Sequence, residues 1–390
     1  MRQFLAALAA VAAFGLSAAT AGAEDKIKVG VLISLSEHGA VTGGMIRDGF
    51  QLAGQQLGGK LGGREVEVIV QDDEIKPEVA VGKANALVKR DQVDFVVGTV
   101  FSNMLNAIMK PVTDAGVFLI SPNAGPSNFA GKDCNPNFFV TSYQNDQVHE
   151  VMGKYAQDNG LKKVFLIAPN YRAGTDALTG FRRYFKGEIA DEIYVPLGTL
   201  DFSAELSRIA AARPDAIFVF LPGGMGINFV KQFRQAGLAD KIQFLSAFTV
   251  DEATLPAQKD AAVGFYGGSN WAPDLDTPQN KQFVATYEKA YGRVPASYAF
   301  EAYDAALLID GALKLTHGST ADKDAMRAAL KQATFTSLRG NFRFNNNHFP
   351  IQDFYLVKVG TRADGNYQTE IVKKVFSDFG DSYAAECAMK

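Results

Sequence analysis

The sequence predicts an α/β protein of two similar lobes, each a Rossmann-like parallel sheet covered by helices on both faces. Short runs of β-branched and apolar residues alternate with amphipathic helical stretches, which is typical of parallel sheets. The alternation begins near residue 26 and restarts near residue 143 with a similar opening. With 390 residues, 47% of them hydrophobic, the chain is long enough for two separate cores.

The first lobe is predicted from strands and helices that follow one another in turn. Apolar residues of its helices recur at intervals of three and four, as in Leu105, Ile108, Met109 and Val112. The predicted strands are 26–34, 64–71, 94–98 and 117–120, and the predicted helices are 45–57, 78–91 and 104–115.

The second lobe repeats this arrangement, and the chain then returns to the first. The expected strands are 162–169, 193–196, 216–221, 242–245 and 354–359, and the helices of the return are 280–291 and 297–315. We therefore expect a first lobe of residues 24–142 and 273–348, a second lobe of residues 143–272 and 349–375, and a tail of residues 376–390. Repeated crossings imply a hinge of three strands rather than one loose linker.

Residues 1–23 are predicted to be a secretory signal peptide. A basic residue near the start is followed by the apolar stretch 5–19 and by Ala-Gly-Ala at 21–23, which fits the small-x-small cleavage rule. A membrane anchor would need about 20 apolar residues. A lipoprotein would need a cysteine beside the cleavage site, and the sequence has none there. We expect an exported, soluble protein of the periplasm.

Cys134 and Cys387 are the two cysteines of the chain. In an oxidising compartment a lone pair usually forms a disulfide. Such a bond would join the C-terminal tail to the loop that follows residue 129. The alternative is two buried thiols.

The turn SPNAGPS at 121–127 follows an apolar strand and is a candidate anion site. Ligands of open α/β sheets bind at this edge, where strands end in loops and helix N-termini. A plain tight turn is the alternative. The candidate donors are the N–H groups of Asn123, Ala124 and Gly125, with the hydroxyl of Ser121 or Ser127.

A second strand end offers further uncharged donors. Ser102 and Asn103 come just before the periodic helix 104–115. Either is an N-cap by default, and the helix dipole adds positive potential at this end. Two neighbouring strand ends with uncharged anion donors favour a carboxylate site over a pair of structural caps.

The catalytic and metal patterns that we sought are missing from the sequence. The four histidines lack metal-binding spacing, and there is neither a GxSxG elbow nor a phosphate-binding Walker loop. The loop PGGMG at 222–226 lacks the third glycine of a dinucleotide turn, so we interpret it as a loop that lets backbone approach a ligand. We expect no enzyme activity, no cofactor and no metal.

The net charge, His38 and the aromatic residues indicate what kind of partner the protein binds. A net charge of −3 without a basic run argues against nucleic acid. His38 follows the first strand at the expected cleft mouth, where it contacts ligand or is exposed to solvent. Five aromatic residues at strand ends predict an apolar-walled pocket: Phe101, Tyr171, Phe220, Phe248 and Trp271.

Taken together, several motifs resemble the branched-chain amino-acid type of periplasmic solute-binding proteins of ABC transporters. These stretches are KIKVGVLISLSEHGAVTGG (26–44), QDDEIKPEVAVGKANALV (71–88), VVGTVFSN (96–103), ISPNAG (120–125), NYRAG (170–174) and YAFEAYDAALL (298–308). The resemblance covers the mature chain and implies the type I two-lobe fold. It implies capture of a small molecule between the lobes, without catalysis, and delivery to a membrane permease.

The resemblance also implies roles for individual residues of the first lobe. In that family a serine after the VVG strand and the backbone of an SPAAT-like turn hold the ligand carboxylate. The serine matches Ser102, and the turn matches Asn123, Ala124 and Gly125.

The second lobe departs from the family pattern at one position. The family places an aromatic residue and a glycine loop there, matching Tyr171 and Gly223, and an acidic residue that meets the α-ammonium. Phe248 stands at that acidic position. An unpaired buried ammonium is costly, so we predict an aromatic carboxylate such as benzoate or a hydroxybenzoate. If instead Asp251 or Glu252 reaches the amine, a branched-chain amino acid is the alternative.

The sequence leaves three classes of function to compare. The favoured class is a monomeric transport binding protein that works with ABC permease subunits. The second is a soluble ligand sensor on the same fold. The third, an enzyme on a two-lobed fold, lacks a nucleophile, metal or cofactor motif to support it.

Overall fold

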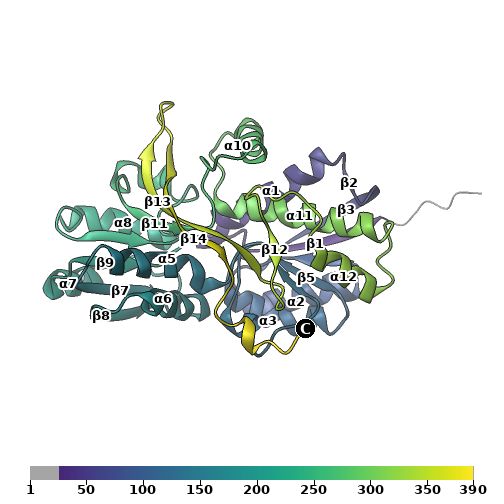
Figure 1. The fold of residues 1–390 in the computed structure, drawn as a ribbon, viewed down its shortest axis with the longest axis horizontal. Helices are drawn as coiled ribbons and strands as arrows, with labels where there is room; N and C mark the ends of the chain where they lie inside the picture. Colours follow the sequence, from purple (N-terminus) through teal and green to yellow (C-terminus); the bar gives the residue numbers. More distant parts are fainter. Residues whose placement is uncertain (1–25, 390) are drawn as a thin grey trace, which may run out of the picture.

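A computed structural model describes residues 26–389, and it has two lobes with one mixed β-sheet each (Figure 1). The predicted signal peptide, residues 1–23, lies outside the described residues. No helix of the described part is long and apolar enough to cross a membrane.

The first lobe contains a 6-stranded sheet in the order β2-β3-β1-β4-β5-β6. All its neighbours are parallel except the short pair β2–β3. The strands are β1 (Ile27–Ile33), β2 (Lys60–Leu61), β3 (Arg64–Asp72), β4 (Phe95–Val97), β5 (Phe118–Ser121) and β6 (Phe138–Val140). Its helical segments are η1 (Glu37–Gly39), α1 (Ala40–Gln56), α2 (Pro77–Lys89), α3 (Ser102–Thr113), α4 (Ser127–Ala130), α10 (Pro278–Tyr291), α11 (Ser297–Leu315) and α12 (Lys323–Gln332).

The second lobe contains an 8-stranded sheet in the order β12-β13-β11-β10-β9-β7-β8, with β14 paired to β13. Its strands are β7 (Lys163–Pro169), β8 (Glu188–Val195), β9 (Ala216–Val219), β10 (Gln243–Ser246), β11 (Tyr266–Ser269), β12 (Arg343–Phe344), β13 (Pro350–Thr361) and β14 (Tyr367–Phe379). Its helical segments are α5 (Asn145–Asp158), α6 (Arg172–Tyr184), α7 (Ser203–Ala212), α8 (Gly224–Gln235), α9 (Leu255–Gln258) and η2 (Lys259–Ala261). Strands β11 to β14 pair antiparallel, so this sheet is mixed and not wholly parallel.

The chain passes between the two sheets after β6, after β11 and before β12. The buried guanidinium of Arg339 donates to the carbonyl oxygens of Thr141 and Ser142, at 2.5 and 3.0 Å, and to Oε1 of Gln352 at 2.6 Å. Nδ2 of Asn270 donates to the Ser142 carbonyl oxygen at 3.3 Å. One polar cluster therefore connects all three passages, in keeping with the predicted three-stranded hinge. The lobe boundaries themselves stay a prediction.

Several predicted boundaries differ from the structure. Helix α1 begins at Ala40 and not at residue 45, because the loop after β1 already turns as η1. Phe101 occupies the cap position of α3, so Ser102 and Asn103 are helical residues and not N-caps. Strand β14 continues to Phe379, which shortens the predicted tail.

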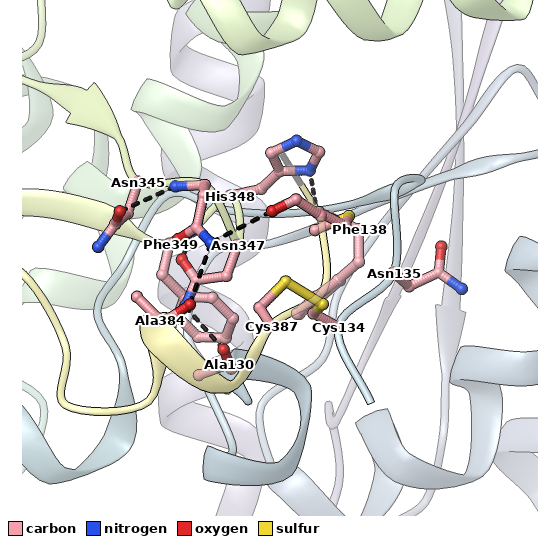
Figure 2. The surroundings of a disulfide bond; sticks show 12 residues. Ala130, Cys134, Asn135, Phe138, Asn345, Asn347, His348, Phe349, Ala384 and Cys387 are labelled. Carbon is pink, nitrogen blue, oxygen red and sulfur yellow. Dashed lines mark hydrogen bonds between the residues drawn. A yellow bond between two sulfur atoms is a disulfide. The ribbon is translucent and has the colours of Figure 1, made fainter. Parts of the chain in front are cut away.

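The predicted disulfide between Cys134 and Cys387 is present (Figure 2). The two Cα atoms are 5.7 Å apart, and the bond joins residues 253 positions apart in sequence. Beside it, Nδ2 of Asn347 donates to the Ala130 carbonyl oxygen at 2.8 Å (Figure 2). The same Nδ2 donates to Oδ2 of Asp381 at 3.0 Å. The tail is therefore fixed to the first lobe by covalent and polar contacts.

Candidate functional site

A cavity lies where the C-terminal ends of the strands of the two lobes face each other. In open α/β folds, ligands bind at this edge of the sheet. Its walls come from both lobes and from the passage between them. The lining residues are Thr42, Val100, Phe101, Ser102, Asn123, Ala124, Tyr143, Asn145, His149, Tyr171, Ala173, Phe220, Pro222, Phe248 and Tyr298.

The first lobe contributes an uncharged hydroxyl at the start of α3. Ser102 is the first residue of α3, and its backbone N–H has no acceptor within residues 26–389. Its Oγ accepts a hydrogen bond from Nδ2 of Asn145 at 3.1 Å. Since that oxygen already accepts, the Ser102 proton is available for a group in the cavity. The positive end of the helix dipole adds to the attraction for an anion.

In the turn after β5, Ala124 presents a free backbone donor. Its N–H has no acceptor among the described residues. The neighbouring Gly125 N–H is not free, because it donates to Oδ1 of Asn145 at 2.9 Å. Asn123 lines the cavity, and its side-chain amide is occupied: Nδ2 donates to the Val100 carbonyl oxygen at 2.6 Å, and Oδ1 accepts from the Tyr143 hydroxyl at 2.8 Å. Its backbone N–H, like that of Ala124, has no acceptor among the described residues. Of the three backbone donors predicted from sequence, those of Asn123 and Ala124 therefore stay free.

The two serine hydroxyls of this turn point elsewhere. Ser121 donates to the Ala124 carbonyl oxygen at 2.7 Å, and Ser127 donates to Oδ1 of Asp176 at 2.7 Å. Both therefore serve the shape of the turn and its packing. The expectation that one of them binds an anion is wrong for this structure.

Aromatic rings form the opposite side of the cavity. Tyr171, the N-cap of α6, lies 6.2 Å from the ring of Phe101 and 6.4 Å from that of Phe220. Phe248 stacks on Tyr143 with ring centroids 5.1 Å apart. The backbone of Phe248 is left-handed, with φ at 58°, a conformation that costs on the order of 1–3 kcal/mol outside glycine. Packing around the ring must offset this cost, so its position is imposed by the tertiary structure.

None of the lining residues, all of which the structure describes, has a charged side chain. His149 is a buried neutral ring, because desolvation lowers its pKa to about 3. Its ring lies 4.9 Å from Phe220 and so belongs to the aromatic side of the cavity. A charged ligand group must therefore be held by neutral donors.

The two acidic residues that could reach an amine lie behind Phe248, outside the cavity. Oδ1 of Asp251 accepts from the Ala253 N–H at 3.0 Å, and Oδ2 accepts from the Tyr298 hydroxyl at 3.1 Å. Oε1 of Glu252 accepts from the N–H and the hydroxyl of Thr369, each at 2.7 Å. Burial raises their pKa values to about 6 and about 7. Both carboxyl groups therefore have structural partners.

At the mouth of the cavity, His38 touches the opposite lobe and does not line the site. A Cβ added to Gly223 would come within 2.5 Å of the His38 carbonyl oxygen, and Gly223 has a φ of 61°. Glycine permits this approach because it has no side chain. Burial lowers the pKa of His38, with Glu37 opposing the shift. His38 and Gly223 therefore contact each other across the lobes, and their role as ligand contacts stays a prediction.

A sequence model of a family described as "Periplasmic binding protein" matches residues 26–366. The chain belongs to this family. Its members are solute-binding components of ABC transporters, which are not enzymes. Similarity extends over nearly the full length of individual relatives.

Three relatives illustrate the range of the similarity. "Leu/Ile/Val-binding protein homolog 6" of Brucella melitensis is 31% identical, covering 96% of this chain and 97% of that protein. A Rhodopseudomonas palustris solute-binding protein in complex with benzoate has a TM-score of 0.89 at 31% identity, covering 94% and 100% of the chains. Another from strain BisB5, with 3,4-dihydroxybenzoic acid, has a TM-score of 0.86 at 33% identity, covering 92% and 99%.

Of the predicted site residues, Phe101, Ser102, Asn123, Ala124, Tyr171 and Phe248 line the cavity. Asn103, Gly125, Gly223 and His38 do not. Trp271 is also outside, because its ring packs on Phe300 in the core with centroids 5.0 Å apart and its Nε1 donates to Asn280. A position at a strand end therefore predicted some, but not all, of the residues that line the cavity.

Sequence reasoning missed the residues contributed by the passage and by distant helices. Tyr143, Asn145 and His149 follow β6, a strand too short to be recognised, and Tyr298 comes from α11. The capping box at the start of α5, where Gln144 and Gln147 bond reciprocally, is a local signal that could have located the helix. No local pattern shows that these side chains meet α3. The described residues contain no group of His, Cys, Asp and Glu side chains suited to a metal ion.

Proposed function

We propose that this protein captures a small aromatic carboxylate, benzoate or a hydroxybenzoate, between its lobes and delivers it to an ABC permease. One observation carries the proposal: the cavity combines uncharged anion donors with aromatic rings, and its lining holds no carboxylate. We further propose that the protein works in the periplasm, after removal of residues 1–23, and as a monomer.

The carboxylate would lie at the first-lobe side of the cavity. The Ser102 hydroxyl and the N–H groups of Ser102 and Ala124 are available there. Hydrogen bonds from such donors to an ionised acceptor are stronger than neutral ones. The start of α3 adds favourable potential without a counter-ion.

The ring would lie between the aromatic residues of the second lobe and the passage. Phe220, Tyr171 and Phe248 present apolar surface, and offset or edge contacts between rings contribute beyond area alone. An α-ammonium in the same place would lose its hydration without gaining a carboxylate partner. Two relatives with bound benzoates support this choice of ligand class.

A thermal-shift screen followed by calorimetry tests the proposal. The panel compares benzoate, 3-hydroxybenzoate and 4-hydroxybenzoate with leucine, valine and threonine. A true ligand at 100 times its Kd adds roughly 2.7 kcal/mol to the free energy of unfolding. We expect stabilisation by the aromatic acids alone. Stabilisation by the amino acids alone would contradict the proposal.

A branched-chain amino acid is the second candidate, because the Brucella relative is named a Leu/Ile/Val-binding protein. The Tyr298 hydroxyl lines the cavity and donates to Oδ2 of Asp251. For this candidate, Tyr298 would have to move and open Asp251 to the ligand amine. A leucine complex in which the amine contacts Asp251 would favour it.

A further inference from the structure

A buried carboxyl group connects the two lobes just outside the cavity. Asp176 of α6 has a relative exposure of 3%. Its Oδ1 accepts from the Ser127 hydroxyl at 2.7 Å, and its Oδ2 accepts from the Ser127 N–H at 3.1 Å. Ser127 begins α4 in the first lobe, whereas Asp176 belongs to the second. The contact therefore exists only when the lobes are together.

The same carboxylate orients the amide of Asn145. Nδ2 of Asn145 donates to Oδ2 of Asp176 at 2.9 Å and to Oγ of Ser102 at 3.1 Å, while its Oδ1 accepts from the Gly125 N–H at 2.9 Å. Both amide hydrogens are thus used, and the amide cannot flip without losing bonds. Ser102 must act as acceptor toward Asn145, which directs its single proton to another group.

Asp176 has no ion pair among residues 26–389. Arg183, from the same helix, pairs instead with Asp146 at 2.8 Å and with Glu150. Burial raises the pKa of Asp176 to about 6, and the neighbouring Asp146 adds to the shift. The hydrogen bonds from Ser127 and Asn145 are therefore the main compensation for burying this group.

We propose that Asp176 is a positioning residue that couples lobe closure to the grip on the ligand carboxylate. Asn145, at the start of α5, is held by Gly125 of the first lobe: its N–H donates to the Gly125 carbonyl oxygen at 2.8 Å, and its Oδ1 accepts from the Gly125 N–H at 2.9 Å. Asp176 sits on α6 of the second lobe, whereas Ser102 and Ser127 belong to the first. Closure brings Asp176 onto Ser127 and Asn145, and only then is the Asn145 amide fixed from both lobes and the Ser102 hydroxyl aligned for the ligand. The role of Ser102 rests on the proposed function.

A double-mutant cycle on benzoate affinity tests the coupling. We expect Asp176→Asn and Ser102→Ala each to weaken binding about tenfold, and the double variant to be far less than a hundredfold weaker, because both changes break one chain of bonds. Glu150→Gln is the control: it alters the α5–α6 ion pair without touching Asn145, so its effect should add to that of Ser102→Ala. Additive effects for Asp176→Asn would overturn the proposal.

A ligand-free cycle separates this proposal from the proposed function. If wild-type protein does not bind benzoate, the proposed function fails, and the contact between lobes is then tested by thermal unfolding without ligand. Here Asp176→Asn and Ser127→Ala should be non-additive, whereas Glu150→Gln and Ser127→Ala should add. Additivity in both pairs would show that Asp176 does not join the lobes.

Discussion

The two sides of the cavity differ in their chemistry and in how the fold positions their groups. The first-lobe side offers a hydroxyl and unpaired backbone N–H groups at the start of α3 and after β5. The second-lobe side offers rings, among them Tyr171, Phe220 and Phe248. The polar side is built from short local turns, which hold donors at fixed positions. The aromatic side is built from side chains whose positions depend on packing with elements far away in sequence.

This difference separates the two parts of recognition. In the proposed complex, the polar side holds the carboxylate, a group that many small metabolites share. The aromatic side would then decide what else the ligand carries, because Phe248 offers a ring and no acid to an ammonium. On this proposal, ligand class depends more on the second lobe than on the first.

The largest expected effect comes from introducing a charge on the aromatic side. Phe248→Glu places a carboxylate beside the ligand carboxylate in a buried site, so benzoate binding should weaken by more than a hundredfold, about 3 kcal/mol. Phe248→Gln is the matched control, since it meets the same φ constraint without the charge. Calorimetry with benzoate and leucine would measure both. If Phe248→Glu gained no affinity for leucine relative to benzoate, Phe248 would not control ligand class.

The polar side is tested by Ser102→Ala. Loss of one charge-assisted hydrogen bond should weaken benzoate binding by about 1–3 kcal/mol. Asn103→Ala is a close control, because Asn103 is adjacent in α3 but does not line the cavity. Equal calorimetric affinities for the two variants would remove Ser102 from the site.

The buried ring of His149 makes a prediction about pH. Its pKa is lowered to about 3 in the folded protein, so the unfolded chain binds a proton more readily. Its contribution to stability is present above about pH 6.5 and is lost as pH falls toward 3. At pH 5 the loss is about 2 kcal/mol relative to pH 7.

His149→Phe should remove this part of the pH dependence. The quantity to compare is the free energy of unfolding of variant and wild type at pH 8, 7, 6 and 5. The difference at pH 8, where both rings are neutral, measures packing alone and is subtracted. A difference that stays constant down to pH 5 would show that His149 becomes protonated without unfolding.

The smallest effects are expected at Tyr171. Its hydroxyl has no hydrogen-bond partner among residues 26–389, so Tyr171→Phe should leave benzoate affinity within about threefold. Tyr171→Ala removes the ring and should weaken binding about tenfold, roughly 1.4 kcal/mol. A large loss in Tyr171→Phe would mean that the hydroxyl reaches the ligand.

Local chemistry made much of the fold predictable. Repeated alternation of strands and helices and the spacing of Leu105, Ile108 and Val112 identified most of the first lobe correctly. The cysteine pair was likewise confirmed. Strand β6 was missed because Phe138–Val140 is too short for a periodic pattern, and its pairing with β5 is decided by the sheet.

The site was predictable where a strand end leads directly into it. Ser102 and Ala124 satisfy this condition, and so does Phe248 after β10. Asn145 does not: its importance comes from contacts with Ser102 and Asp176, which are 43 and 31 positions away in sequence. Contacts at such separations leave no periodic or local signal.

The amino-acid sequence by itself determined the two α/β lobes, the disulfide that binds the tail, the uncharged donors after β4 and β5, and a phenylalanine at position 248, where the family resemblance implies an acid. The tertiary structure alone decided which donors stay free. In the fold, the Gly125 N–H donates to Asn145 and the Ser127 hydroxyl donates to Asp176. Both acids behind Phe248 accept hydrogen bonds from other partners. The physical reason is that a buried polar group must find a partner wherever the fold brings one, and that partner is chosen by distance in space and not along the chain.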